Sequence, residues 1–467
     1  MTLTLKGDNS FTGGISGNSS YDLSGISSSG SLTISGGETD SLTAQGGSGE
    51  NGGDGIFSFG RVAISGGTVT ANGDDGGRGI SSRGGVTISG GSTVTANGGN
   101  GTISGGDGIC SSGGVTISGG STVTANGGNG GSIGGGSGIY SNGSVTISGG
   151  TVTANGGKGG SGYGGDGIRS LDHVAISGGT VTANGGNSTN SSGGYGIISL
   201  DVAISSGTVN ANGGDSKDGY GGDGIHSNGV TISGNTVNAA GGYGGKVGGY
   251  GICSFDRVAI SGGTVEAAGG NGSTGGGSGI YSSVIDLSGS LELTAKAGSP
   301  TGKALLQNGR ELDLDTIKDK LGPGAKVTAT DANGDSKQVS VPRPVEPEGP
   351  VIPEDSSSSS DGGSAAPSAP ASPLPGLTVT DKDGQRISYT STQSGNTLTV
   401  CVGRFTASFR ISLAALRQLR AEGIETITFQ TILCSTTLSV DELLAMGGED
   451  AEAVLTHRFT DSSLTVG

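Results

Sequence analysis

The feature that most constrains this sequence is a repeat of about 28 residues in which only certain positions change. The isoleucine of the motif "ISGG", or of a close variant, marks each copy, and successive copies lie 24 to 30 residues apart. These isoleucines are Ile34, Ile64, Ile88, Ile117, Ile147, Ile176, Ile204, Ile232 and Ile260. A period of this length is typical of solenoids, in which each repeat stacks on its neighbour and extends one continuous core.

Each repeat contains three short apolar stretches, "GI-x-S", "V-x-I-S" and "T-V-x-A", which are separated by glycine-rich turns. Their alternation has a period of two, which predicts strands, and no stretch has room for a helix. Three strands per turn predict an all-β, right-handed parallel β-helix of about ten turns over residues 1–300. The 104 glycines among 467 residues then belong to turns of a repeat and not to a low-complexity segment.

Two polar columns are expected along this β-helix. The serine two residues after the isoleucine of each "GI" is expected to face inward. Because a buried hydroxyl without a hydrogen-bond partner is costly, we expect these serines to form a ladder in which each hydroxyl bonds to a neighbour. These serines are Ser58, Ser82, Ser111, Ser141, Ser170, Ser199, Ser227, Ser254 and Ser282. The asparagine of "ANGG" recurs from Asn72 to Asn212 and suits a stacked turn. This second ladder should stop at Asn212, because Ala240 and Ala268 take its place in the next two repeats.

The rest of the chain divides into three parts. Residues 301–341 are predicted to cap the solenoid with a short helix near Asp315–Lys320 and a hairpin at "DANGD". No glutamate follows at the twelfth position of a calcium loop, so a hairpin turn is the preferred interpretation. Residues 342–376 are a Pro- and Ser-rich acidic linker. Residues 377–467 alternate strand and helix patterns, which predicts a small α+β domain and a candidate surface for a protein partner.

Charge and hydropathy exclude several classes of partner. The formal net charge is −16 and no basic block exists, so we expect no nucleic-acid partner. No apolar run approaches the roughly 18 residues of a membrane span. The first residues, "MTLTLKGDNS", lack the apolar core of a signal peptide, so the protein is either cytosolic or a fragment of a longer exported chain. Met1 stands in a pattern typical of a strand already under way, which favours the fragment.

The four cysteines do not form a disulfide scaffold. Cys110 and Cys253 are five turns apart, roughly 24 Å, which no disulfide spans. Cys401 and Cys434 either form a bridge in the last domain or remain two strand thiols, and both alternatives stay open.

One face of the repeat carries the variable residues. The outward column beside "GI-x-S" holds Phe57, Ser81, Cys110, Tyr140, Arg169, Ile198, His226, Cys253 and Tyr281. The next column holds Phe59, Arg83, Ser112, Asn142, Leu171, Leu200, Asn228, Phe255 and Ser283. Stacked at the strand spacing, they form a strip of roughly 40 Å.

Aromatic rings on this strip suit the flat faces of sugar rings, and polar neighbours suit their hydroxyls. We therefore predict an extended glycan site formed by Tyr140, Asn142, Arg169, Leu171, His226, Asn228, Phe255 and Tyr281. The alternative is that these side chains are covered by the glycine-rich loops or by another chain, as Phe57, Phe59 and Phe255 could be.

Catalytic and metal sites are not predicted. Asp54, Asp107, Asp166 and Asp223 share the position in "GDGI", with neighbours two turns apart, near 9.6 Å. That separation is close to the ~6.5–9.5 Å of an inverting glycosidase pair, but Asp before Gly is common in turns. It is too wide for two carboxylates to share one calcium. His226 and Cys253 lie one turn apart and could contact one metal, but two ligands do not make a site. No cofactor is expected.

The repeat "GSGIYSNGSVTISGGTVTANGG" resembles those of pectate-lyase-like right-handed β-helices. It is similar, more narrowly, to the non-catalytic carbohydrate-binding β-helix proteins on the surface of Clostridia-type gut bacteria. The resemblance covers about residues 14–300. The polygalacturonase motifs "NTD", "GHG" and "RIK" are absent, which argues against the enzymes of this superfamily.

These observations lead to three functional hypotheses. The first is an extracellular or cell-surface protein, not an enzyme, that binds a polysaccharide or surface glycan along one face. The second is a polysaccharide lyase or glycoside hydrolase. The third is a structural stalk or adhesin whose contacts are made by the last domain.

Overall fold

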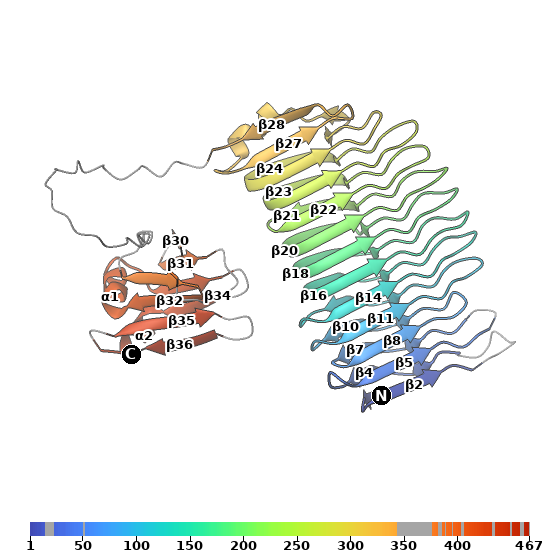
Figure 1. Cartoon of the computed structure of the whole chain (residues 1–467), viewed down its shortest axis with the longest axis horizontal. Coiled ribbons are helices and arrows are strands. Elements are labelled where there is room, and N and C mark those ends of the chain that lie inside the picture. Colours follow the sequence, from blue (N-terminus) through green and yellow to red (C-terminus); the bar gives the residue numbers. More distant parts are fainter. Residues whose placement is uncertain are drawn as a thin grey trace, which may run out of the picture. The chain divides into compact units, whose positions relative to one another are not determined.

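The alternating motifs form three columns of parallel strands, one for each motif of the repeat (Figure 1). Residues at the same motif position pair across turns, so that Val86 lies beside Val115 and Ile88 beside Ile117. This computed structural model describes residues 1–14, 23–49, 52–342, 376–381, 385–387, 389–394, 396–402, 406–431, 435–448, 451–457 and 462–466. The chain divides into two compact units, Met1–Glu348 and Gly349–Gly467.

Short strands occupy one column each. The GI-x-S column contains β3 (Ile26–Ser28), β6 (Ile56–Ser58), β9 (Ile80–Ser82), β12 (Ile109–Ser111), β15 (Ile139–Ser141), β17 (Ile168–Ser170), β19 (Ile197–Ile198) and β25 (Leu305–Gln307). The V-x-I column contains β1 (Thr2–Thr4), β4 (Leu32–Ser35), β7 (Arg61–Ser65), β10 (Gly85–Ser89) and β13 (Val115–Ile117). The T-V-x-A column contains β2 (Asp8–Thr12), β5 (Ser41–Gln45), β8 (Thr68–Asn72), β11 (Thr93–Asn97), β14 (Thr122–Asn126), β22 (Thr236–Ala240) and β27 (Lys326–Thr330).

Longer strands follow the chain around a corner and belong to more than one column. The V-x-I and T-V-x-A columns share β16 (Val145–Asn155), β18 (His173–Asn184) and β20 (Asp201–Asn212). The GI-x-S and V-x-I columns share β21 (Ile225–Ile232). All three columns include β23 (Ile252–Ala268) and β24 (Ile280–Lys296).

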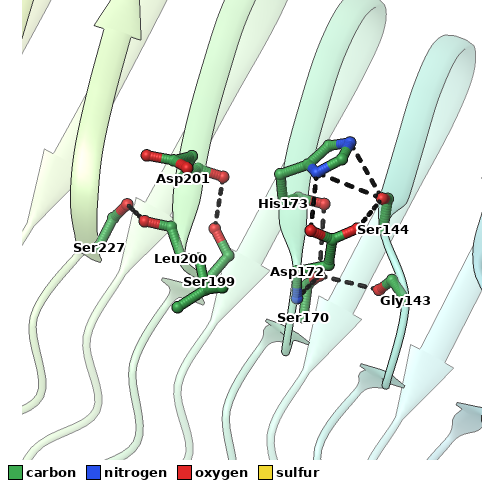
Figure 2. A network of polar contacts seen from close by, with 9 residues as sticks. All are labelled: Gly143, Ser144, Ser170, Asp172, His173, Ser199, Leu200, Asp201 and Ser227. Atoms are coloured by element: carbon green, nitrogen blue, oxygen red, sulfur yellow. Dashed lines mark hydrogen bonds and ion pairs between the residues drawn. The ribbon is translucent and has the colours of Figure 1, made fainter.

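The core is built from the inward positions of these columns. Ile139, Val145 and Ile147 are 0% exposed, and the same holds within a few per cent for their equivalents in other turns. The column of serines also faces inward, as predicted, and each hydroxyl finds a backbone carbonyl instead of another serine. Ser141 donates to Gly113 O at 2.8 Å. Figure 2 shows the equivalent hydrogen bond one turn later, from Ser170 to Gly143 O at 2.9 Å. A hydroxyl at this corner therefore satisfies a carbonyl, which belongs to the preceding turn in most cases and to the same turn at Ser111 and Ser199.

The asparagine ladder is confirmed, including its end. Each Nδ2 donates to the Oδ1 of the preceding turn at 2.8 Å, for example from Asn155 to Asn126. The chain of amides runs from Asn72 to Asn212, where Ala240 becomes the strand partner. Amides stack in this way because each one offers a donor and an acceptor on opposite sides.

The glycine-rich loops leave one corner of the solenoid, as predicted, and they project side by side (Figure 1). We call this layer the glycine fin, defined as residues 98–107, 127–137, 156–166, 185–195, 213–223, 241–250 and 269–278. Each loop has an outgoing and a returning leg. The backbone of Gly136 donates to Gly128 O within one loop, and Gly157 donates to Gly136 O in the previous loop, at 2.9 and 2.8 Å. The fin is thus a hydrogen-bonded layer.

Close backbone packing explains the glycine content of the fin. A Cβ at Gly157 would lie 1.9 Å from Gly128 O, and one at Gly165 would lie 1.9 Å from Gly136 O. Neighbouring legs approach so closely that only hydrogen fits at these positions.

The solenoid has about 13 turns, more than the ten predicted. The stretch before residue 50 and the cap extend its columns, since β25 and β27 both pair in parallel with β24. The cap then closes with β26 (Arg310–Glu311), the 3₁₀ helix η1 (Leu314–Lys320) and β28 (Ser336–Ser340). The strands β27 and β28 form the predicted hairpin around Asp331–Asp335, and η1 buries Leu314 and Ile317.

The second unit is a small α+β domain, as predicted. One sheet has the order β29 (Leu377–Thr380), β32 (Ala407–Ser412), β35 (Glu452–His457), β36 (Ser462–Val466). The other has the order β30 (Thr390–Ser394), β31 (Thr397–Cys401), β33 (Thr426–Gln430), β34 (Ser435–Ser439). Ser412 and Ser439 cap the helices α1 (Leu413–Ala421) and α2 (Val440–Ala445). Cys401 donates to Gln430 Oε1 at 3.4 Å, and its suggested partner Cys434 lies outside the described residues.

None of the helices in the described part of the chain is long and apolar enough to cross a lipid bilayer. The linker predicted for residues 342–376 lies almost entirely outside the described residues.

The strand register predicts a strong contrast between two substitutions. Ser141→Lys places a charge in the core and should lower the free energy of unfolding by about 3–5 kcal/mol. Thr146→Lys, on the outward side of β16, should change it by no more than about 1 kcal/mol. Urea unfolding monitored by circular dichroism measures both, and equal effects would contradict this register.

Because the fin is so closely packed, we expect a single methyl group added there to destabilise the protein. Gly157→Ala should lower the free energy of unfolding by about 1–3 kcal/mol, because its Cβ would overlap the Gly128 carbonyl. Gly30→Ala is the matched control, since nothing lies within 4 Å of a Cβ there. If both variants melt like the parent protein, the close packing of the fin is wrong.

Candidate functional site

A groove lies between the returning legs of the glycine fin and the GI-x-S face. It consists of two adjoining cavities of about 380 and 440 Å³, which share Ser192, Gly193 and Tyr195. The first extends to Ser104 and the second to Tyr281. The groove therefore crosses seven successive turns, a length of roughly 29 Å at the strand spacing.

Aromatic side chains dominate the second cavity. The ring of Tyr195 stacks on His226 with centroids 4.4 Å apart, and Tyr250 stacks on Tyr281 at 5.1 Å. Phe255 meets His226 edge-on at 5.2 Å and is 56% exposed. The partners in each stack come from adjacent turns, so the strand spacing sets the distance between the rings.

The aspartates of the "GDGI" position have a structural function. One carboxylate oxygen of each accepts the backbone N–H of the equivalent residue in the next turn. Asp166 accepts from Tyr195, Asp107 from Ser137 and Asp223 from Tyr250, at 2.7–2.8 Å. Two buried carboxylates in adjacent turns would lie near 4.8 Å and repel each other, which explains their occurrence in alternate turns.

The second oxygen of each aspartate has a different partner in each turn, and those of Asp166 and Asp223 belong to residues that line the groove. Asp166 contacts Arg169 at 3.2 Å, and Asp107 contacts Arg78 at 3.7 Å. Asp223 contacts Nδ1 of His226 at 2.6 Å. Burial, opposed by the backbone N–H of the next turn and by the arginine, raises the pKa of both Asp107 and Asp166.

Asp223, His226 and Cys253 form a cluster in the second cavity. One ligand atom from each, a carboxylate oxygen, an imidazole nitrogen and the thiol sulfur, lies within 4.8 Å of the other two. His226 and Cys253 are register partners on β21 and β23, and Asp223 ends the returning leg of the fin just before β21. Asp223 and Cys253 are buried and His226 is partly exposed.

This cluster differs from a Cys–His–Asp catalytic triad. In a triad the imidazole lies between nucleophile and carboxylate, so that the base activates the thiol. Here Asp223 interacts with both His226 and Cys253. Burial, and next the Asp223 charge, raise the pKa of Cys253, so its thiol is a poor nucleophile near neutral pH.

A second polar constellation lies at the opposite end of the GI-x-S strands (Figure 2). Ser144 Oγ donates to Asp172 at 2.7 Å and lies 3.0 Å from His173 Nε2, while His173 Nδ1 is 3.0 Å from Asp172. In a serine triad the imidazole lies between the hydroxyl and the carboxylate, whereas here the Ser144 hydroxyl also donates directly to Asp172. The Ser144 hydroxyl, and next His173, hold the pKa of Asp172 below its usual value. These contacts link the corners of two adjacent turns by hydrogen bonds at an exposed surface.

Four of the eight predicted ligand residues line the groove. Arg169 lines the first cavity, and His226, Phe255 and Tyr281 line the second. Tyr140 lies beside Arg169, whose guanidinium carbon is 6.0 Å from its ring centroid.

The other three predicted residues, Asn142, Leu171 and Asn228, are exposed and do not line these two cavities. The alternative that Phe57, Phe59 and Phe255 are sealed under loops is wrong for Phe59 and Phe255, because both are more than half exposed. Phe57 is partly exposed.

The groove also contains residues that the motif columns did not predict. Tyr163, Tyr195, Tyr220 and Tyr250 all come from the fin, which the sequence presents only as loops of variable length. The motif "GDGI" predicts only a turn residue at Asp223, although the spacing "D-G-I-H" places it three residues before His226. The same spacing in "D-G-I-R" gives the Asp166–Arg169 pair and was an available signal.

No protein-family model, no curated protein and no solved structure matches this chain. The fold and the geometry of the groove therefore supply the functional argument.

The thiols of this face are predicted to resist alkylation in the folded protein. Burial, and next the Asp107 charge, raise the pKa of Cys110 to about 12, which leaves roughly one thiol in ten thousand ionised at pH 8. Cys253 should be at least as slow. Iodoacetamide labelling followed by peptide mass spectrometry measures both, with urea-denatured protein as the control. Labelling of the folded protein as fast as the denatured protein would contradict this description.

Proposed function

We propose that this protein binds carbohydrate non-catalytically along the groove between the glycine fin and the GI-x-S face. The observation that carries the proposal is the row of tyrosine and phenylalanine side chains from successive turns, with Arg169 and His226 between them. Ring faces suit the apolar faces of pyranoses, and charged or amide groups suit their hydroxyls.

A chain-like ligand fits this groove better than a compact one. The lining residues of both cavities come from successive turns along the solenoid, and the two cavities adjoin at Ser192, Gly193 and Tyr195, so a linear polymer could extend from one to the other. An extended polysaccharide or surface glycan is the ligand class that we propose, and an extracellular or cell-surface location belongs to the same proposal. The likeness of the repeat to carbohydrate-binding β-helix surface proteins is consistent with it.

The aspartates of the groove favour binding over cleavage. Asp166 and Asp223 each use one oxygen to hold the backbone of the next turn and the other to contact a cationic or imidazole partner. A general acid and a general base need an oxygen free to reach the substrate. This occupancy supports a binding protein over a lyase or hydrolase.

The proposal predicts that stacked rings carry the affinity. Glycan-array screening identifies the ligand, and calorimetry then compares Tyr281→Ala and Tyr195→Ala with the parent protein. Each should weaken binding by about 1–2 kcal/mol, because a ring that contacts sugar is an anchor. Thr146→Ala, on a face without variable residues, is the control and should bind like the parent.

Two outcomes would contradict the proposal. Unchanged affinity of both tyrosine variants would place the ligand elsewhere and favour a stalk or adhesin. Appearance of new reducing ends or unsaturated products during the titration would favour a polysaccharide-cleaving enzyme.

A further inference from the structure

Three different ligand types converge in the second cavity of the groove. The carboxylate of Asp223, the imidazole of His226 and the thiol of Cys253 lie within 4.8 Å of one another. Their positions are fixed by the fold, because Ile225 and Ile252 anchor the two strands in the core with 0% exposure. The cluster is therefore set by the β-helix itself.

The donor set selects one class of cation. Sulfur and imidazole nitrogen favour Zn²⁺ and related transition metals, whereas Ca²⁺ and Mg²⁺ prefer oxygen. Three protein ligands that include Cys and His are typical of zinc sites in which the fourth position stays open. That position would face the groove, since all three residues line the second cavity.

In the equivalent turns the aspartate has a cationic partner, which Asp223 lacks. Asp107 and Asp166 each face a guanidinium, from Arg78 and Arg169, at 3.7 and 3.2 Å. Asp223 faces an imidazole and a thiol, neither of which carries a fixed positive charge. A divalent cation there would supply the charge that arginine supplies in the other two turns.

The surroundings of the cluster orient its ligands. Tyr195 stacks on the His226 ring and Phe255 abuts it edge-on, which fixes the plane of the imidazole. The other oxygen of Asp223 accepts the Tyr250 N–H at 2.7 Å, which fixes the carboxylate. Such supporting contacts around the ligands are a regular part of metal sites.

We propose that Asp223, His226 and Cys253 bind one Zn²⁺ ion, with the fourth coordination position open to the groove. On binding, the Cys253 thiol releases its proton to solvent and its sulfur bonds to the metal, and the hydrogen bond between Asp223 and His226 is replaced by a bond from each group to the metal, with no change of oxidation state. The inference does not depend on carbohydrate binding.

Zinc analysis of the full-length chain tests the proposal. Bound metal is first removed from the protein with EDTA under reducing conditions. The protein is then incubated with ZnCl₂ and desalted, and its zinc content is measured by inductively coupled plasma mass spectrometry. We expect one zinc per chain in the parent and in Cys110→Ser, and loss of this zinc in Cys253→Ser and His226→Gln. Cys110→Ser is the matched control, because Cys110 stands on the same face beside Asp107 but near Arg78 and without an imidazole.

Cobalt substitution separates ligation from folding. Co²⁺ added to the parent and to Cys110→Ser should give a sulfur-to-cobalt absorption band in the near ultraviolet, absent in Cys253→Ser. In EDTA, Cys253→Ser should melt like the parent, and added zinc should raise the melting temperature of the parent alone. A parent that takes up no zinc, or a Cys253→Ser variant that retains the zinc and the band, would overturn the proposal.

Discussion

The whole solenoid depends on one constraint, the register of backbone hydrogen bonds between turns about 4.8 Å apart. Because this register is kept from turn to turn, each side chain lies against the equivalent side chain of the neighbouring turn. Each column must therefore consist of groups that can lie next to copies of themselves without repulsion or an unsatisfied polar atom. Aliphatic groups do so by packing, asparagine amides by donating along the column, and inward serines by reaching a carbonyl. Groups that repel their own kind, such as the "GDGI" aspartates, alternate with others.

The same constraint explains where chemistry can differ between turns. Inward positions and the Thr- or Ala-bearing faces are nearly uniform, whereas the GI-x-S face and the fin change from turn to turn. A site in this fold is thus assembled from neighbours across turns and not from a local motif. The cluster of Asp223, His226 and Cys253 arises in this way, as do the stacked pairs Tyr195–His226 and Tyr250–Tyr281.

This dependence sets how much the sequence predicts. Strict alternation and repetition predict the three strand columns, the inward serines and the end of the asparagine ladder at Asn212, because each follows from register alone. The fin could not be predicted as a layer, since glycine leaves no side-chain pattern and its contacts are between backbones. The fin tyrosines and the position of Asp223 in the groove were missed for the same reason: the strand alternation that orients side chains stops where the fin begins.

The alternation of aspartate with neutral or basic residues has a further consequence. Although the fold repeats every turn, the aspartate column repeats every second turn, about 9.6 Å, and two of its members, Asp166 and Asp223, lie in the groove. Their partners differ, an arginine for one and an imidazole for the other, so a linear polymer shifted by two turns would meet different groups. The groove would therefore distinguish the two ends of such a chain, although the backbone that forms it is the same in every turn.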